Sequence, residues 1–356
     1  MPALDLQSER GGLHLPRLGL WLDAPHAVRG TERVFVSHAH SDHTARHREV
    51  ILSAPTAELM RARLGGERIE HRLSFGETRA FTGGDSAFRL TLLPAGHILG
   101  SAMALIEAEG SSLLYTGDFQ LRPSLAAEPC EPRRADVLVM ETTFGRPEYR
   151  FPPATRVVSE LVGFCRETLA AGATPVLFAY SLGKSQEVLC LLGAAGLPVQ
   201  LHPQAHKLTH VYVRCGQALP PFEVFKPDTA RGRVLICPPG FTTLPELEAL
   251  GAVRTAVVTG WALNSSCRFQ YGVDAAFPLS DHADFPDLLR MVELVSPRQI
   301  LTVHGFAADF ARTLRERGHD ARALGLEEQL DLGLRVEQRP KRRKARHQSA
   351  AALPAS

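Results

Sequence analysis

Paired cysteines are missing from the sequence. Its six cysteines lie far apart and none forms a CxxC pair; they are Cys130, Cys165, Cys190, Cys215, Cys237 and Cys267. This spacing argues against a zinc ribbon and against a framework of disulfides. We therefore predict that the six cysteines are reduced thiols packed in the core.

The sequence also lacks a long apolar run and a strong net charge. No run approaches the roughly 20 apolar residues that cross a bilayer, and the N-terminal residues MPALDLQSER lack the basic start and apolar core of a signal peptide. We therefore expect a cytoplasmic protein with no membrane contact. The formal net charge is +2, so composition alone does not indicate a nucleic-acid binder. The content of 44% hydrophobic and 22% charged residues is ordinary for a globular enzyme.

Positive charge is concentrated near the C-terminal end of the sequence. A basic cluster runs from Arg339 to Arg346 and is followed by small residues, which predicts a disordered tail over 336–356. Such a tail could add salt-sensitive affinity for phosphates. It could equally be a solubilising end with no specific role.

Apolar runs separated by turn signals organise the chain, and no internal repeat is present. In the first half we predict a helix at 54–66 and strands at 34–37, 88–95, 101–108, 111–118 and 136–142. From about residue 152, strands and helices alternate. The predicted helices are 155–173 and 181–196, and the predicted strands are 174–180, 197–203, 232–239 and 255–261. This alternation indicates a compact α/β unit with a largely parallel sheet.

Four potential metal ligands follow the first predicted strand in the run VFVSHAHSDHTARH. They are His38, His40, Asp42 and His43. Imidazole and carboxylate groups suit zinc, and the alternation of side chains lets the first two face one ion while the other two face a second. Crowded ionisable groups are rare without a partner. The cluster therefore predicts a metal site.

Further ligands stand at the ends of other predicted strands. His97 lies in the loop PAGHILGSA, Asp118 ends SSLLYTGDF, and His304 ends QILTVHGF. Each alone carries little weight, since an aspartate at a strand end is commonly a cap. Together they bring the count of candidate ligands to seven. A site with one ion is the alternative, and it would leave Asp42 and His43 without a role.

The HxHxDH run, the histidine of the PAGHILG loop and the aspartate of TGD resemble motifs of the metallo-β-lactamase superfamily. Asp23, in LGLWLDAP, resembles the superfamily's first motif, and the resemblance implies that it orients ligands without binding metal. The resemblance implies a hydroxide between two zinc ions as the nucleophile, because bound zinc lowers the pKa of water to about 7. It assigns His38, His40 and His97 to one ion, Asp42, His43 and His304 to the other, and Asp118 to both.

Three further residues narrow the resemblance to the β-CASP group, whose members cut RNA or DNA. Glu141 lies in VLVMETTFG, His282 in LSDHADF and His304 in TVHGF, in an order that resembles motifs A, B and C of that group. The implied α/β fold is a metallo-β-lactamase αββα sandwich with an inserted β-CASP α/β domain. The implied parts are 1–151 and 271–335 for the metallo-β-lactamase domain, 152–270 for the insertion and 336–356 for the tail.

Glu141 and His282 suit the chemistry of phosphodiester cleavage. The reaction expels an alkoxide that needs a proton, and His282 could supply it or stabilise charge on the phosphoryl oxygens. Glu141 would hold the imidazole in the right tautomer and raise its pKa. The predicted catalytic residues are therefore Glu141, His282 and Asp42, which is also a metal ligand. The simpler alternative is that Glu141 and the Asp281-His282 pair are helix caps.

The insertion carries SLGKSQE at the start of a predicted helix. Ser181, Gly183 and Lys184, with the helix N-terminus, could form a phosphate cradle. The segment is not a Walker motif, because Phe178 stands where the first glycine should be. An ordinary helix cap is the alternative. Arg268, in WALNSSCRFQYG, is a further candidate contact for a nucleic-acid backbone.

The segments VDAAFPLSDHADFPDLL and ILTVHGFAADFARTLRERGHDARAL are most similar to those of bacterial ligase-associated DNA exonucleases. This resemblance implies a zinc-dependent exonuclease of DNA repair with two Zn²⁺ per chain, Mn²⁺ being an alternative ion. It implies single-stranded DNA, favoured over RNA, as substrate, and a DNA ligase and a helicase as partners. An RNA-processing nuclease, a small-molecule metallohydrolase and a non-catalytic scaffold stay open as alternatives. The last two fit the sequence less well. A small-molecule hydrolase would not need Glu141 or His282, and a non-catalytic scaffold would not need all seven candidate metal ligands.

Overall fold

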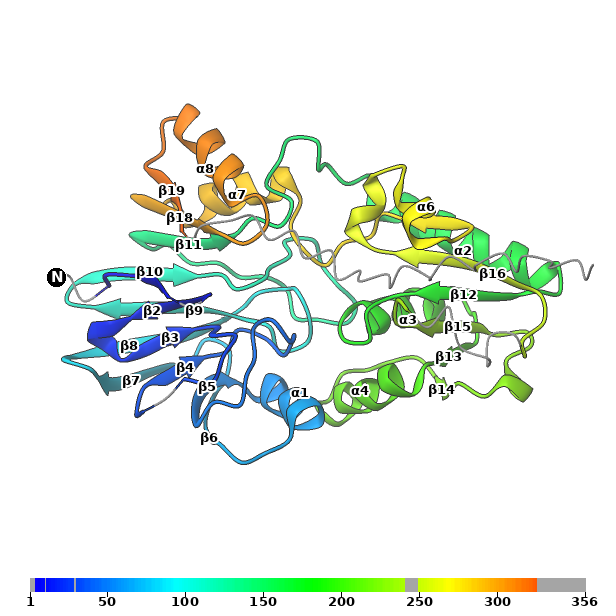
Figure 1. Cartoon of the computed structure of the whole chain (residues 1–356), viewed down its shortest axis with the longest axis horizontal. Helices are drawn as coiled ribbons and strands as arrows, with labels where there is room; N and C mark the ends of the chain where they lie inside the picture. The colour runs from blue at the N-terminus through cyan, green and yellow to red at the C-terminus, as the bar shows by residue number, and fades with distance from the viewer. Residues whose placement is uncertain (1–3, 10, 29, 241–248, 325–356) are drawn as a thin grey trace, which may run out of the picture.

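The computed structural model describes residues 4–9, 11–28, 30–240 and 249–324. The predicted basic tail lies outside these residues. Figure 1 shows two parts, a sandwich of two sheets and a third sheet with its own helices. No helix in the described ranges is both long enough and apolar enough to cross a membrane.

The sandwich consists of a six-stranded and a seven-stranded sheet. The first has the order β1 (Gln7–Glu9), β2 (Gly12–Leu15), β3 (Leu20–Leu22), β4 (Arg33–Phe35), β5 (Glu49–Ser53) and β6 (Ile69–Leu73). The second has the order β19 (Ala321–Ala323), β18 (Gln299–Val303), β11 (Val137–Glu141), β10 (Ser111–Tyr115), β9 (Ala102–Ala108), β8 (Ser86–Pro94) and β7 (Thr78–Gly83). Apolar side chains of both sheets, among them Phe35, Leu92 and Tyr115, meet between them in one buried cluster.

Helices cover the outer face of each sheet. On the second sheet lie α7 (Phe285–Val295) and α8 (Ala307–Glu316), which bury Leu288 and Phe310. On the first lies α1 (Ala54–Leu64), whose Met60 packs beside Val50. The layers therefore have the order αββα (Figure 1), as the sequence predicts.

The third sheet is parallel throughout, with the order β14-β13-β15-β12-β16-β17. Its helices are α2 (Ala154–Ala170), α3 (Lys184–Ala194), α4 (Pro203–Arg214) and the short α6 (Cys267–Tyr271). Its strands are β12 (Thr174–Phe178), β13 (Val199–Leu201), β14 (Glu223–Val224), β15 (Val234–Cys237), β16 (Val253–Val258) and β17 (Ala275–Phe277). Strand β17 lies beyond residue 270, so this sheet extends past the C-terminal bound of the predicted insertion, 152–270.

The predicted helices and strands all occur, with ends shifted by a few residues. Helix α4 was not predicted. It buries Leu208, Val211 and Tyr212 against α1 and the first sheet, so part of its apolar face is covered by the sandwich. The six cysteines are free thiols in the structure, as predicted, and four of them are buried.

Strand direction brings the candidate site residues to one edge. Strands β10, β11 and β18 are parallel, with Glu141 level with Val303. Strand β8 pairs antiparallel with β9, and β9 antiparallel with β10, so β8 shares their direction. Because the carboxyl ends of parallel strands share one sheet edge, the residues that follow these strands gather there.

Candidate metal centre

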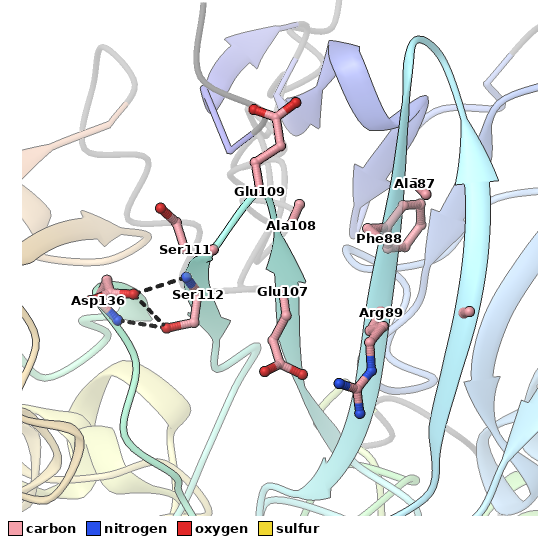
Figure 2. A pocket seen from close by; sticks show the side chains of 11 residues that line it. Ala87, Phe88, Arg89, Glu107, Ala108, Glu109, Ser111, Ser112 and Asp136 are labelled. Atoms are coloured by element: carbon pink, nitrogen blue, oxygen red, sulfur yellow. Dashed lines mark hydrogen bonds between the residues drawn. The ribbon is translucent and has the colours of Figure 1, made fainter.

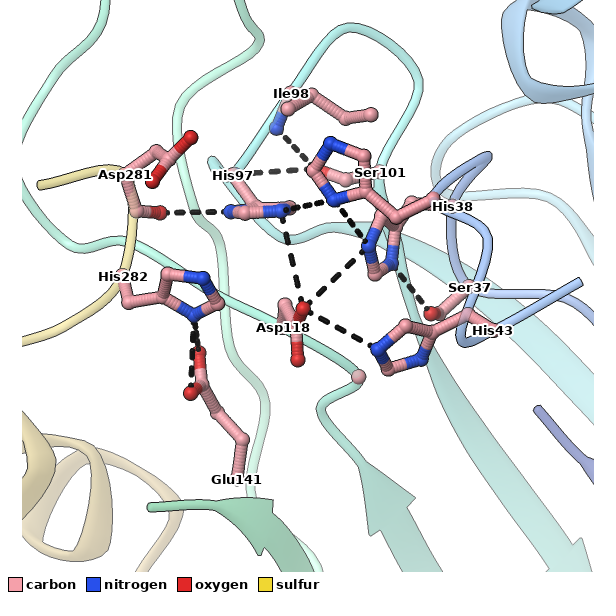
Figure 3. A network of polar contacts seen from close by, with 12 residues as sticks. Ser37, His38, His43, His97, Ile98, Ser101, Asp118, Glu141, Asp281 and His282 are labelled. Atoms are coloured by element: carbon pink, nitrogen blue, oxygen red, sulfur yellow. Dashed lines mark hydrogen bonds and ion pairs between the residues drawn. The ribbon is translucent and has the colours of Figure 1, made fainter. Parts of the chain in front are cut away.

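Three histidines and one aspartate turn their ligand atoms toward a common point at this edge, and Figure 3 shows two of these histidines, His38 and His97, beside Asp118. One ligand atom of each of His38, His40, His97 and Asp118 lies within 4.8 Å of all the others. His40 Nδ1 is 3.0 Å from His38 Nε2 and 3.1 Å from His97 Nε2. Asp118 Oδ2 is 3.4 Å from His38 Nε2 and 3.8 Å from His97 Nε2.

These spacings fit a metal ion. Zinc–nitrogen bonds of about 2.0–2.1 Å place neighbouring atoms of a tetrahedron roughly 3.3 Å apart. The nitrogen–nitrogen distances of 3.0 and 3.1 Å are close to that value. The donor set of three imidazoles and a carboxylate is also one that zinc prefers.

Backbone turns present these side chains. Gly117, with φ +53°, lies beside Ser37, and a Cβ atom at this position would come within 2.5 Å of the Ser37 Cβ. Only glycine therefore lets the turn after β10 approach the loop after β4 closely enough to place Asp118 next to His38. His304 has a positive φ of +57° without being glycine, and its carbonyl accepts a 2.6 Å bond from the Thr142 hydroxyl.

A second group of ligands lies on the other side of Asp118. His43 Nε2 is 3.3 Å from Asp118 Oδ2 and 3.5 Å from Asp42 Oδ2. The His304 ring centroid is 5.5 Å from that of His43. Asp42 is exposed, with 76% of its side chain accessible. Asp118 therefore stands between the two predicted ligand groups, as a bridging carboxylate would.

Two of the histidine rings are fixed by hydrogen bonds that they donate to Asp23 and Ser37. The Asp23 carboxylate accepts from His43 Nδ1 at 2.9 Å, from the Ser37 hydroxyl at 2.5 Å and from the Tyr115 hydroxyl at 2.8 Å. Since the Ser37 hydroxyl donates to Asp23, it accepts from His38 Nδ1, 2.9 Å away. Both histidines therefore carry their proton on Nδ1, which leaves Nε2 for a metal.

Backbone carbonyls fix the other two rings. His40 Nε2 donates to the carbonyl of Leu182 at 3.2 Å, and His97 Nδ1 donates to the carbonyl of Asp281 at 2.8 Å. A carbonyl can only accept, so the remaining nitrogens, Nδ1 of His40 and Nε2 of His97, have free lone pairs. These are the atoms that converge on Asp118.

The electrostatics of His38 and Asp118 suit metal binding, which needs neutral imidazoles and an ionised carboxylate. At His43, burial lowers the pKa, but the carboxylates of Asp118, Asp23 and Asp42 outweigh burial and raise it well above its usual value. Burial and the neighbouring His43 hold the pKa of His38 well below its usual value. Burial alone would raise the pKa of Asp118, but His43 and His282 outweigh it and keep that pKa well below its usual value. Asp118 is therefore ionised at neutral pH.

Glu141 and His282 form a pair beside this centre. The buried Glu141 accepts from His282 Nδ1 at 3.0 Å and from the Phe119 amide at 2.9 Å. Burial lowers the pKa of His282, but the carboxylates of Glu141 and Asp118 outweigh burial and raise it to about 10. The ring is therefore protonated at neutral pH, and a divalent cation beside it would lower this pKa by repulsion. Its centroid is 4.6 Å from that of His97.

Comparison with known proteins agrees with this geometry. Residues 275–324 match the model of the RMMBL family, a "Zn-dependent metallo-hydrolase RNA specificity domain". The chain is 55% identical over 325 residues to a "Probable DNA ligase" of Opitutus terrae and 28% identical over 284 residues to the 5' exonuclease Apollo of Gallus gallus. It is 29% identical over 187 residues to an RNase J-like protein of Methanocaldococcus jannaschii. The chain is thus similar to zinc-dependent metallo-hydrolases and nucleases.

The matched lengths differ between the chains. The match covers 91% of this chain and 31% of the Opitutus protein, 77% of this chain and 59% of Apollo, and 46% of this chain and 44% of the RNase J-like protein. The chain thus spans less than two thirds of each of these relatives. A solved structure from Enterococcus faecalis V583 has the same fold, with a TM-score of 0.54 at 14% identity over 83% of this chain and 79% of that one.

The SLGKSQE segment lies beside the candidate metal centre, but its lysine already has two carboxylate partners. Lys184 is 1% exposed, and its Nζ lies 2.7 Å from Glu187 Oε2 and 3.8 Å from Asp281 Oδ1. The Gly183 amide donates to the Gln186 side chain at 2.7 Å. Ser181 is half-buried in the preceding turn. Two carboxylates neutralise the ammonium, so a phosphate that bound Lys184 would have to compete with them.

Arg268 lies elsewhere on the surface. It borders a pocket of about 520 Å³ in the inserted unit with Asn264, Phe269 and Asp274, and none of the predicted metal ligands lines it. Another pocket, of about 480 Å³, lies over the strand ends of β8 and β9 that are opposite the metal centre (Figure 2). Arg89, Glu107 and Asp136 line that one, and it holds no predicted site residue.

Some residues that shape the centre were not predicted from the sequence. Ser37 and Tyr115 anchor Asp23, and the carbonyls of Leu182 and Asp281 orient His40 and His97. Ser37 precedes the HxHxDH run directly, so its position offered a signal. The backbone carbonyls offered none, because any residue type supplies one.

Proposed function

We propose that this chain is a two-zinc nuclease that hydrolyses phosphodiester bonds, with Mn²⁺ as an alternative ion. The observation that carries the proposal is the bonded Glu141–His282 pair beside seven candidate ligands. The resemblance to the β-CASP group and the similarity to relatives named as exonuclease and RNase support it. One ion would be held by His38, His40 and His97, the other by Asp42, His43 and His304, and both by Asp118.

Divalent ions at such a site lower the pKa of water and offset the negative charge of the phosphodiester. The protein's own residues do the remaining work. Glu141 accepts from His282 Nδ1, so Nε2 is the nitrogen that can serve the substrate. A protonated His282 can give its Nε2 proton to the departing oxygen. Asp23, through Ser37 and His43, keeps ligand rings in place throughout.

Single-stranded DNA, degraded from an end during repair, is the substrate that we propose. One relative is named a 5' exonuclease, Apollo, and another is named a DNA cross-link repair 1A protein, from Mus musculus; the second is 24% identical over 85% of this chain. A strand without a partner reaches a site between two domains more easily than a duplex does. Cleavage and binding should weaken as salt rises, since phosphates attract the cations of the protein.

Cleavage of RNA is the second candidate function. The RMMBL model is described as an RNA specificity domain and matches 275–324, and one relative is named RNase J-like. Matched DNA and RNA strands of one sequence, linear and circular and each carrying an internal label, separate the candidates. DNA degradation that requires a free end supports our proposal. Equal cutting of circular DNA would make the protein an endonuclease, and degradation of RNA alone would favour the second function.

A DNA ligase and a helicase are the protein partners that we propose. The support is that the Opitutus relative, named "Probable DNA ligase", matches this chain over only 31% of its own length. Co-purification of the chain with an ATP-dependent ligase from its own source tests the first partnership. Retention of the ligase at 150 mM salt, roughly physiological ionic strength, is expected. Its elution with unrelated proteins would contradict the partnership.

A further inference from the structure

The inserted domain reaches into the metal centre through one short segment. The carbonyl of Leu182, just before α3, accepts the Nε2 proton of His40 at 3.2 Å. Two residues later, Lys184 opens α3 and points its buried Nζ between Glu187 and Asp281. The segment that the sequence suggested as a phosphate cradle thus contacts a candidate ligand and a carboxylate that precedes His282.

Asp281 connects this lysine to a second ligand. The Asp281 carbonyl accepts from His97 Nδ1 at 2.8 Å, and its carboxylate lies 3.8 Å from Lys184 Nζ. In Figure 3, Asp281 lies on the side of His97 that faces away from Asp118. The residue next to Asp281 is His282, whose ring bonds Glu141. One loop therefore orients a metal ligand and carries the proposed proton donor.

Two polar side chains of the sandwich, Arg122 and Gln120, hold the same loop. Arg122 donates to Glu187 Oε1 at 2.6 Å and to the Ser280 carbonyl at 2.9 Å. The Gln120 amide donates to that carbonyl at 3.0 Å. Removing one member of a buried ionic network leaves an uncompensated charge, so such networks hold a single arrangement.

We propose that Lys184 is a positioning residue of the metal centre, acting through Asp281 on His97 and through its segment on His40. This inference rests on the proposed metal binding but not on nuclease activity. Partners of metal ligands typically change metal affinity by about 10–100-fold when they are removed. The proposal therefore predicts that loss of the Lys184 charge weakens metal binding. A phosphate cradle would instead predict that the same change weakens nucleic-acid binding.

Lys184→Met, which keeps the length and loses the charge, tests this proposal against Lys184→Arg. Zinc affinity is measured by competition with a chromophoric chelator, and single-stranded DNA affinity by fluorescence anisotropy. We expect about 10–100-fold weaker zinc binding in Lys184→Met, substantial recovery in Lys184→Arg and unchanged DNA affinity in both. Unchanged zinc affinity with weaker DNA binding would overturn the proposal and restore the cradle.

A second variant covers the case in which Lys184→Met does not fold. Arg122→Gln removes a partly exposed member of the network and keeps Lys184 in place. We expect Arg122→Gln to lose zinc affinity as well, by a smaller factor than Lys184→Met does. Normal zinc affinity in folded Arg122→Gln would contradict the positioning role. A wild-type chain that binds no zinc at all would instead contradict the proposed function itself.

An independent observation concerns two histidines on the surface of α4. His206 and His210 are spaced by one helical turn, and their Nε2 atoms lie 3.3 Å apart. Phe222 packs against both rings, with centroids 5.4 and 5.1 Å away, which limits their motion. Two imidazoles at i and i+4 on one helix face are a known arrangement of zinc ligands.

We infer that His206 and His210 bind a third divalent transition-metal ion, outside the candidate metal centre. The spacing of 3.3 Å equals roughly the edge of a tetrahedron around zinc. Imidazole pairs also suit Ni²⁺ and Cu²⁺.

Titration of the zinc-loaded protein with Ni²⁺ tests this site by calorimetry. Wild type is expected to bind one Ni²⁺ that His206→Ala weakens by on the order of 10²-fold, because two linked ligands bind far better than one. His319→Ala, which removes another exposed histidine, serves as the matched control and should bind as wild type does. Equal Ni²⁺ binding by His206→Ala and wild type would show that the two histidines form a hydrogen bond and no metal site.

Discussion

His282 Nδ1 lies 3.0 Å from Glu141 Oε1, although 141 residues separate the two along the chain. The whole third sheet, β12 to β17, lies along the chain between β11, which ends at Glu141, and the loop of His282. The pair therefore forms only when the inserted domain returns the chain to the sandwich. A carboxylate bonded to one ring nitrogen leaves the other for proton transfer.

Replacing His282 should separate chemistry from metal binding. His282→Ala is expected to keep its metal and to lose about 10²–10⁴-fold in cleavage rate, the usual worth of general acid–base assistance. Elemental analysis and a cleavage assay on the same sample check this. His304→Ala is the matched control and should lose metal. Loss of metal from the His282 variant would contradict the assignment of the two histidines.

Asp118 should matter more for metal content than any single histidine. It lies 3.4 Å from His38 Nε2 and 3.3 Å from His43 Nε2, so both proposed ions need it. We expect about two ions per chain in active protein and near-complete loss in Asp118→Ala. The count is best made in a His206→Ala background, which removes the proposed surface site. One ion or none in active protein would count against the two-ion centre.

Asp23 should affect metal affinity without touching metal. It has a positive φ of +46° and accepts bonds from Ser37, His43 and Tyr115. Asp23→Asn is expected to weaken zinc binding by about 10–100-fold, and Tyr115→Phe by less. Tyr212→Phe is the control, since the Tyr212 hydroxyl meets only the Leu99 amide, at 3.4 Å. Equal effects of the two tyrosine variants would contradict a specific role for Asp23.

The thiols should be slow to react. Burial raises the pKa of Cys165 and, with nearby carboxylates, that of Cys130 to about 12; burial and Glu187 raise that of Cys190 to about 11. The nucleophile is the thiolate, so at pH 8, roughly the normal pKa of a free thiol, these groups stay protonated. Iodoacetamide should label them slowly in the folded protein and label all six cysteines quickly in denaturant. Fewer than six labelled cysteines without reductant would indicate a disulfide.

The candidate metal ligands were recognisable in the sequence because each follows a strand in a local motif. HAHSDH, PAGH and TGD place their side chains at strand ends whatever the rest of the chain does. Asp23, Glu141 and His282 needed the family resemblance, because nothing local distinguishes them from caps. The strands and helices of the sandwich were predictable from apolar periodicity, since each has one buried face.

Lys184 shows what the sequence could not reveal. A lysine after SLG at a helix start is consistent with phosphate binding, and only the fold brings Asp281 and Glu187 to its ammonium. Helix α4 was missed for a related reason. Part of its apolar stripe packs on α1 of the other domain, so its pattern depends on contacts that are distant in the sequence.

Metal-dependent cleavage of single-stranded DNA is the most direct test of the proposed mechanism. The protein is stripped with chelator, dialysed and titrated with Zn²⁺ or Mn²⁺, while release of nucleotides from a labelled linear strand is followed. We predict no cleavage by the stripped protein, full recovery at about two ions per chain, and no recovery in Asp118→Ala. Cleavage by metal-free protein, or by Asp118→Ala at the wild-type rate, would contradict the two-metal centre.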